Sequence, residues 1–289
     1  MKILVIGSGF IASALIQRLE SEGHELLIFS RTINKEFYSQ QIIGDIFNFE
    51  EFSKVLAWKP QIIIHTAWIT TPGLYRDDTS NYKYAGFTVE LAKHVAFSDV
   101  EQLIVLGTCA EYGHQEGPST AGVTKLLPIT LYAEQKVTAF KTSKELLHGS
   151  NTRLTWARIF YPYGPNQNQN RLIPQLIHAL KIKESFLLTD RTSVHDWVTT
   201  RDIASAVSWI IGNKVPTEID FGTSVGFTNL ELLLTLEKLL QTTLQQPLNL
   251  VDETVQGEVC VVGRDSPLFT SGWLPADSLI SGLEWVLSS

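Results

Sequence analysis

The sequence predicts an α/β protein built on a doubly wound parallel sheet, followed by a smaller C-terminal lobe. Short runs rich in Ile, Leu and Val recur at 2–7, 25–30, 61–65, 102–107 and 153–160. These runs are too uniformly apolar for strands with one wet face, so they indicate strands that are covered on both faces. Stretches with helical spacing of apolar residues separate them, and this β-α-β-α alternation is typical of a doubly wound sheet.

The predicted crossover helices span residues 10–22, 49–57, 80–97 and 131–148. The chain then changes texture at a loop rich in Pro, Gly, Asn and Gln (161–171). Beyond this loop, helices are predicted at 172–182, 201–212, 228–241 and 276–287. We therefore predict a sheet domain of residues 1–160, to which the segment of about 194–222 returns, and a lobe formed by 161–193 and 223–289.

The composition limits the classes of function. The 289 residues are 44% hydrophobic and 18% charged, which suffices for a full core. A net charge of -7 without any basic run argues against a nucleic-acid surface or an anionic-membrane patch. The strand-like run begins at residue 2, so we expect no secretory leader, no membrane span and a cytoplasmic location. The spacings of Cys109, Cys260 and the seven histidines predict neither a disulfide nor a metal site.

The first strand runs into the segment GSGFIA (7–12) and then directly into a helix. In this context Gly7 allows a tight turn, Gly9 lets the backbone approach a pyrophosphate, and the small Ala12 permits close helix–strand packing. The pattern predicts a dinucleotide site in a Rossmann-type sheet. The alternative is a glycine-rich turn that binds nothing.

The end of the second strand, FSRT (29–32), indicates which dinucleotide is bound. Arg31 stands where an acidic residue would bind the ribose 2'-hydroxyl of NAD, and Ser30 and Thr32 add hydroxyl donors. A guanidinium can hold a 2'-phosphate through two N–H groups. NADP(H) is therefore favoured over NAD(H), and the alternative interpretation of Arg31 is an ordinary surface cation.

The segment YAEQK places Tyr132 and Lys136 one helical turn apart, so their side chains share a face. A nearby ammonium is expected to lower the pKa of a phenol, which would make the pair a general acid/base. The spacing alone is common in helices. The segment TCAEYG (108–113), however, delivers Thr108 to the carboxyl edge of the sheet, where ligands of doubly wound proteins bind.

Further segments match one family: GDI (44–46), IIHTAW (63–68), RIFYPYGP (158–165) and HDWVTTRDIA (195–204). Over essentially its whole length the chain resembles the extended short-chain dehydrogenase/reductases, which include NAD(P)-dependent epimerases, dehydratases and ketoreductases of nucleotide sugars. The resemblance implies a cytoplasmic enzyme with an NADP-binding Rossmann domain and a smaller C-terminal substrate-binding lobe. It also implies a homodimer that pairs through helices 80–97 and 131–148.

The resemblance implies that Thr108 hydrogen-bonds the substrate carbonyl or hydroxyl, that Tyr132 donates or accepts the proton, and that Lys136 supports Tyr132 with its charge. The cofactor residues implied by the resemblance or by spacing are Gly7, Gly9, Phe10, Ile11, Ser30, Arg31, Thr32, Asp45, Ile46, Thr66, Ala67, Tyr132, Lys136 and Tyr161 (or its neighbour Pro162). Asp45 and Ile46 would flank the adenine, and Tyr161 would lie near the nicotinamide.

Departures from the family pattern narrow the reaction. The family's dehydratases carry Asp-Glu directly after the catalytic Thr, where this chain has Cys109 and Ala110. Dehydration is therefore disfavoured, and Cys109 is expected to pack. The remaining expectation is a reductase that transfers a hydride from NADPH to a keto group, with Tyr132 as proton donor. The alternatives are a sugar epimerase and a non-catalytic NADP-binding sensor or scaffold.

The substrate is less well specified. The family often clamps a substrate diphosphate with one arginine in an RDY or RDF motif and another in an RxGD motif; this chain has His195 in the first and VQGE (255–258) in the second. A 4-keto-6-deoxy nucleotide sugar is still the leading substrate, with Trp68, Arg171, His195 and Arg201 as candidate contacts. The alternative for Arg171 and Arg201 is a charge at the surface or one that bridges the lobes. Trp68 either stacks on a sugar face or packs beneath its loop. Asn81 either replaces a family asparagine or lies at the surface.

Overall fold

The computed structural model describes residues 1–244 and 257–289. Its main sheet has the strand order β3-β2-β1-β4-β5-β6-β9, and all neighbouring strands are parallel. The strands are β1 (Lys2–Ile6), β2 (Glu25–Ser30), β3 (Gln40–Ile43), β4 (Ile62–His65), β5 (Gln102–Thr108), β6 (Arg153–Ile159) and β9 (Glu218–Phe221). The order reverses between β1 and β4. The predicted Rossmann-type fold class is confirmed.

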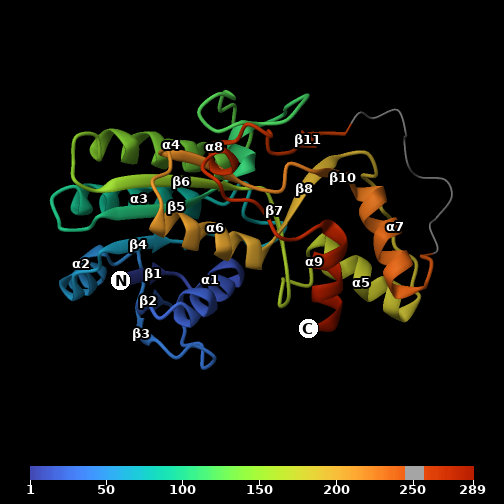
Figure 1. The fold of residues 1–289 in the computed structure, drawn as a ribbon, viewed down its shortest axis with the longest axis horizontal. Helices are drawn as coiled ribbons and strands as arrows, with labels where there is room; N and C mark the ends of the chain where they lie inside the picture. The colour runs from blue at the N-terminus through green and yellow to red at the C-terminus, as the bar shows by residue number, and fades with distance from the viewer. Residues whose placement is uncertain (245–256) are drawn as a thin grey trace.

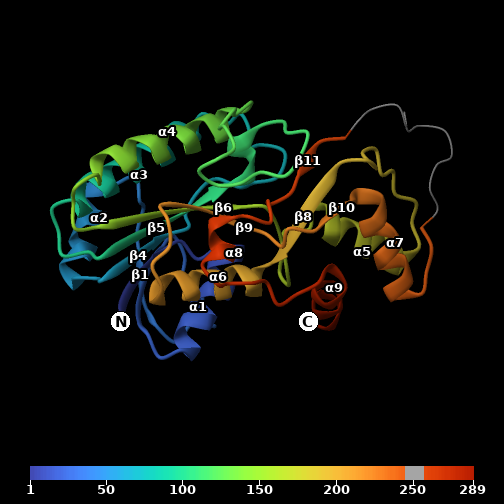
Figure 2. The same ribbon diagram turned by 45° about the horizontal axis from the view of Figure 1, so that its top comes forward.

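Helices cover both faces of this sheet. Figures 1 and 2 show α3 (Ser80–Val95) and α4 (Leu131–Leu146) on one face, and α1 (Phe10–Ser21) and α6 (Thr200–Gly212) on the other. Alternate residues of β1 enter the two cores: Ile3 and Val5 pack on the α1 and α6 side, and Leu4 and Ile6 pack on the α3 and α4 side. Because a strand presents successive side chains to opposite faces, burial on both faces explains the uniformly apolar runs.

A second, smaller sheet forms part of the lobe. Its strands are β8 (Val194–Thr199), β10 (Gly226–Thr228), β11 (Val259–Cys260) and β7 (Tyr161–Tyr163). The helices α5 (Leu172–Ile182), α7 (Asn229–Leu240) and α9 (Leu279–Ser288) pack around the buried Tyr163 and Trp197. The segment 194–222 therefore divides: β9 lies in the main sheet, whereas β8 lies in the small one.

Some elements differ from the sequence-based expectations. β3 has no buried residue because it is an edge strand, so no apolar run marks it. The predicted helix at 49–57 is instead an α-helix, α2 (Phe49–Ser53), that continues as a 3-10 turn, η1 (Lys54–Trp58). A short helix, α8 (Pro267–Thr270), carries no sequence period.

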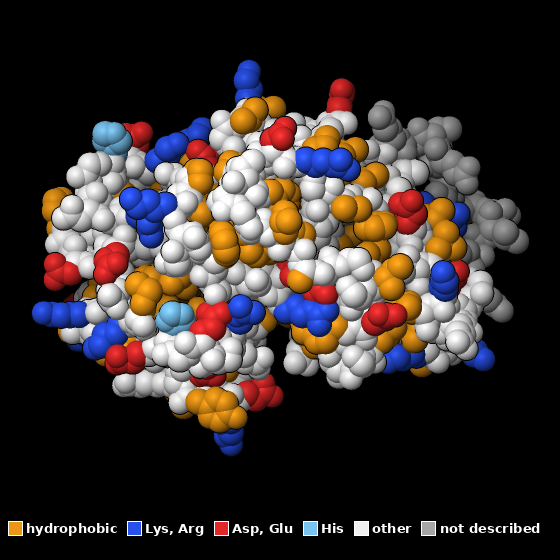
Figure 3. Space-filling view, in the orientation of Figure 1, with side chains coloured by type: hydrophobic (Ala, Val, Ile, Leu, Met, Phe, Trp, Pro, Cys, Tyr) orange, Lys and Arg blue, Asp and Glu red, His pale blue; other side chains and the backbone are white. Residues whose placement is uncertain are grey.

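Two surface features bear on the expected partners. On the face shown in Figure 3, Lys and Arg side chains lie interspersed with Asp and Glu. None of the helices in the described residues is both long and apolar enough to span a membrane.

Candidate functional site

A cavity of about 1720 Å³ opens at the carboxyl edge of the main sheet. The loop from β1 to α1, the ends of β2, β4 and β5, the start of α4, and β7 and β8 of the lobe all contribute to its wall. The predicted residues that line it are Gly7, Gly9, Phe10, Ile11, Ser30, Arg31, Thr32, Asp45, Ile46, Thr66, Ala67, Trp68, Thr108, Tyr132, Lys136, Tyr161, Arg171 and His195.

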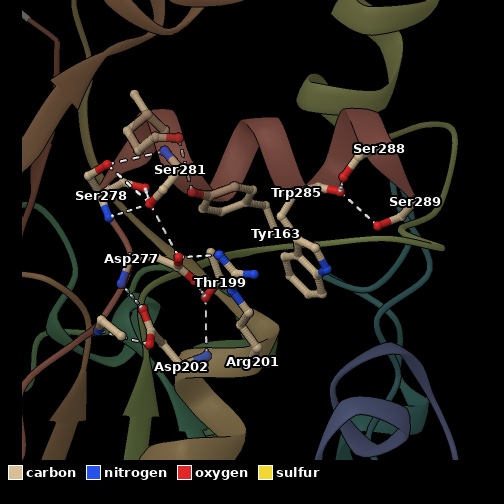
Figure 4. A network of polar contacts seen from close by, with 12 residues as sticks. Tyr163, Thr199, Arg201, Asp202, Asp277, Ser278, Ser281, Trp285, Ser288 and Ser289 are labelled. Atoms are coloured by element: carbon tan, nitrogen blue, oxygen red, sulfur yellow. Dashed lines mark hydrogen bonds and ion pairs between the residues drawn. The ribbon is translucent and has the colours of Figure 1, made fainter.

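Arg201 is the exception, because it does not line the cavity. It lies in the first turn of α6, where its guanidinium pairs with Asp277 and packs over the Trp285 ring at 4.5 Å (Figure 4). Asp277 also accepts the hydroxyl proton of Thr199 at 2.8 Å. The expectation that Arg201 contacts substrate is therefore wrong in this structure: it ties α9 to α6.

The glycine loop has the backbone that its sequence predicts. Gly7 has φ +106, and a Cβ there would meet Thr66 Oγ1 at 2.5 Å, so glycine lets the end of β4 pack beneath the loop. Gly9 is the N-cap of α1 and has no neighbour within 4 Å of an added Cβ. No side chain caps this helix. The backbone N–H groups of its first turn therefore suit a pyrophosphate.

The turn after β2 leaves two donors for a phosphate. Ser30 Oγ donates to the Thr32 carbonyl at 2.6 Å, so its proton is used within the turn. Arg31 and Thr32 are exposed beside the cavity. Ser30 therefore shapes the turn, while Arg31 and Thr32 place side-chain donors beside the cavity.

Thr108, Tyr132 and Lys136 come together at the centre of the cavity wall. Thr108 ends β5, and its side chain lies near enough to Tyr132 to influence the pKa of the phenol. Tyr132 and Lys136 are both buried in the first turns of α4. Lys136 Nζ donates to the Leu106 carbonyl at 2.6 Å and lies 3.9 Å from the centre of the Trp68 ring.

The prediction that the pKa of Tyr132 is lowered is wrong. Burial raises the pKa of Tyr132 above its usual value, and the nearby Thr108 side chain opposes this only in part. Burial also lowers the pKa of Lys136 to about 7, while the Glu111 carboxylate opposes that shift. The phenol is therefore protonated at neutral pH, which suits a proton donor better than a base.

Lys136→Met tests this burial through the pH dependence of stability. The Lys136 pKa is about 7 in the fold and ~10.4 in an unfolded chain, so between these values only the unfolded state keeps the proton. The stability of the wild type should therefore rise with pH across this window relative to the variant, by up to about 1.4 kcal/mol per pH unit. Urea unfolding of both proteins at several pH values measures the difference, and a difference that is independent of pH would contradict the shifted pKa.

Asn81 holds the loop after β4 in place through hydrogen bonds. This residue is fully buried, and its Oδ1 accepts the Trp68 Nε1 proton at 2.7 Å while its Nδ2 donates to the carbonyls of Tyr75 and Asp78. Asn81 is therefore not a surface residue. Trp68 packs against Tyr84 and Lys136, which leaves it at the cavity wall beside the predicted acid.

On the lobe side of the cavity, the predicted residues His195 and Tyr161 form a cluster with Asn229 and Glu258, which were not predicted site residues. His195 stacks on Tyr161 at 3.8 Å, and its ring nitrogens lie 3.0 Å from Asn229 Oδ1 and 3.5 Å from Glu258 Oε1. The contact with His195 and the hydrogen bond from the Tyr161 hydroxyl lower the pKa of Glu258 to about 2. Any positive charge on His195 is thus balanced by Glu258. Residues 255 and 256 of the VQGE segment lie outside the described residues.

The comparisons with known proteins decide the family. A family model described as the NAD dependent epimerase/dehydratase family matches residues 3–221. The chain belongs to this family. None of the curated proteins that were compared matches it.

Solved structures share the fold of this epimerase/dehydratase family member. UDP-glucose 4-epimerase from Thermotoga maritima, with UDP-glucose, has a TM-score of 0.86 at 18% identity, covering 100% of this chain and 98% of that one. UDP-glucose 4-epimerase of Thermus thermophilus, with NAD, has a TM-score of 0.85 at 19% identity, and the match covers 100% of both chains. dTDP-glucose 4,6-dehydratase from Bacillus anthracis, with NAD, has a TM-score of 0.82 at 21% identity, covering 100% of this chain and 97% of that one. The family makes this chain a nicotinamide-dependent oxidoreductase or epimerase.

Proposed function

We propose that this enzyme reduces a keto group of a sugar, with NADPH as hydride donor and Tyr132 as proton donor. The observation that carries the proposal is that Thr108 and the buried, protonated Tyr132 meet on the wall of a cavity that also contains the glycine loop. A protonated phenol can neutralise the alkoxide that develops as a carbonyl accepts a hydride.

Each residue of the cluster has a definite part in this reaction. When bound, NADPH supplies the hydride. Thr108 donates to the carbonyl oxygen and holds it beside Tyr132, which transfers its proton as negative charge builds there. Lys136, when protonated, favours the resulting phenolate and donates to ribose hydroxyls.

The same geometry disfavours dehydration. A dehydratase needs an acid and a base on the substrate side of the catalytic threonine, and here those positions are Cys109 and Ala110. The nearby carboxylate of Glu111 is fully buried and does not line the cavity. Epimerisation remains the second candidate, because family neighbours of the same fold include 4-epimerases.

The proposed substrate is a nucleotide-activated 4-keto-6-deoxy sugar. Structural neighbours were solved with UDP-glucose or UDP-glucuronic acid. In this chain Arg171 lies at the cavity, where its guanidinium donates to the Thr70 carbonyl at 3.0 Å and packs over Tyr75 at 5.4 Å. With Arg76 on the same wall, it supplies positive charge suited to a diphosphate. We further propose that residues 1–160 bind the cofactor, that the lobe binds the sugar, and that the enzyme pairs as a dimer through α3 and α4.

The direct test incubates the enzyme with NADPH and a panel of 4-keto-6-deoxy nucleotide sugars while following dihydronicotinamide absorbance. Net oxidation of NADPH supports the reductase. Isomer conversion without net oxidation would indicate the epimerase, and cofactor binding without turnover of any sugar would indicate a sensor.

A further inference from the structure

The carboxylate of Glu111 lies directly behind the end of β5, in the 3-10 turn η2 (Cys109–Tyr112). It is fully buried and accepts N–H groups from the Thr108 backbone at 2.9 Å, from Trp156 at 3.0 Å and from Arg158 at 2.7 Å. These donors come from two adjacent strands of the main sheet. A buried carboxylate held by several donors, one of them charged, has little freedom to move.

The local sequence makes room for this contact. A Cβ on Gly107 would meet Trp156 Nε1 at 2.4 Å and Glu111 Oε1 at 2.7 Å, so glycine is needed for the carboxylate to reach β5. Glu111 and Thr108 form a capping box, in which Thr108 Oγ1 accepts the Ala110 N–H at 3.3 Å. Glu111 therefore fixes the backbone of Thr108, whose side chain lies at the cavity wall near Tyr132.

Glu111 also sets the local charge. The fully buried Arg158 guanidinium has Glu111 and Glu218 as its carboxylate partners, the latter at 3.1 Å. Among the described residues, His65 on β4 and Glu111 on η2 interact electrostatically with Lys136, and Tyr132 lies one turn before it on α4. Tyr132 is protonated, and burial lowers the pKa of His65 to about 3, so both are neutral near pH 7. Glu111 is then the anion that favours the ammonium of Lys136.

We propose that Glu111 is a positioning residue for the reduction: it holds Thr108 beside Tyr132 and places a buried carboxylate near Lys136. The proposal rests on the proposed function for the role of Thr108. Its effect on Lys136, however, can be measured without turnover.

The first test follows the titration of Lys136 by NMR of protein labelled at lysine, with Lys136→Arg to assign the signal. In Glu111→Gln the Lys136 pKa should fall by about one unit, because the nearby anion is removed. Glu218→Gln is the matched control, since it removes a carboxylate partner of the same Arg158 but not the contact with Thr108. An unchanged Lys136 pKa in Glu111→Gln, or an equal fall in both variants, would overturn the proposal.

The second test separates positioning from folding. In Glu111→Gln, kcat should fall about tenfold or more while the Kd of NADPH changes little, and in Glu218→Gln both should stay near the wild-type values. If Glu111→Gln fails to fold by circular dichroism, Glu111→Asp should keep the Lys136 pKa near wild type and lower kcat, because it keeps the charge but retracts it by one methylene. A Glu111→Asp variant in which the Lys136 pKa falls together with kcat would contradict the proposal. Absence of turnover in the wild type would instead refute the proposed function, and the Lys136 titration would still decide the role of Glu111.

Discussion

Tyr132→Phe should lower kcat by about 10²- to 10⁴-fold and leave the Kd of NADPH nearly unchanged. The substitution removes the hydroxyl near Thr108 and keeps the ring, which packs edge-on against Tyr75 and Trp68. Steady-state kinetics on the best sugar of the panel, together with fluorescence titration by NADPH, measures both quantities.

Tyr82→Phe is the control for this substitution. Tyr82 lies on α3, is 58% exposed and does not line the cavity, so the loss of its hydroxyl should change neither quantity. A Tyr132→Phe enzyme with wild-type kcat would remove the proton-transfer role of Tyr132. A large loss of NADPH affinity in that variant would instead assign the hydroxyl to cofactor binding.

Arg31→Ala should weaken NADPH binding by about 10- to 100-fold and change NADH binding little. A hydrogen bond from a charged group contributes roughly 1.5–3 kcal/mol, and NADH has no 2'-phosphate to lose. Calorimetric titration of the wild type and the variant with both cofactors measures this preference.

Lys35→Ala separates specific recognition from general electrostatics. Lys35 is an exposed cation on the same loop that does not line the cavity. An equal effect of Lys35→Ala and Arg31→Ala would mean that the loop acts only through its charge. Equal loss of NADH and NADPH binding in Arg31→Ala would contradict the proposed selectivity.

Much of the sheet and of the cavity wall follows from local sequence. The apolar runs locate the buried strands because β1, β4 and β5 are covered on both faces, and the spacing of Gly7 and Gly9 locates the turn before α1. The resemblance then placed Thr108, Tyr132 and Lys136 on one site. Strand β3 was not predicted, because an edge strand needs no continuous apolar run.

What the sequence did not reveal depends on contacts between distant residues. In the sequence Glu111 resembles an ordinary acidic residue at the start of a helix. Its role appears only in the fold, where Arg158 and Trp156 of β6 hydrogen-bond its carboxylate. The direction of the Tyr132 pKa shift depends on burial, which no i, i+4 spacing records. In the same way Arg201 looks like a free cation in the sequence, and only the fold places Asp277 beside it.

Transfer of deuterium from NADPH deuterated at nicotinamide C4 tests the central claim most directly. The account predicts one deuterium on the reduced carbon of the sugar by mass spectrometry, for each NADPH oxidised, with the rate of this transfer lowered about 10²- to 10⁴-fold in Tyr132→Phe. An isomerised sugar without deuterium and without net NADPH oxidation would contradict it.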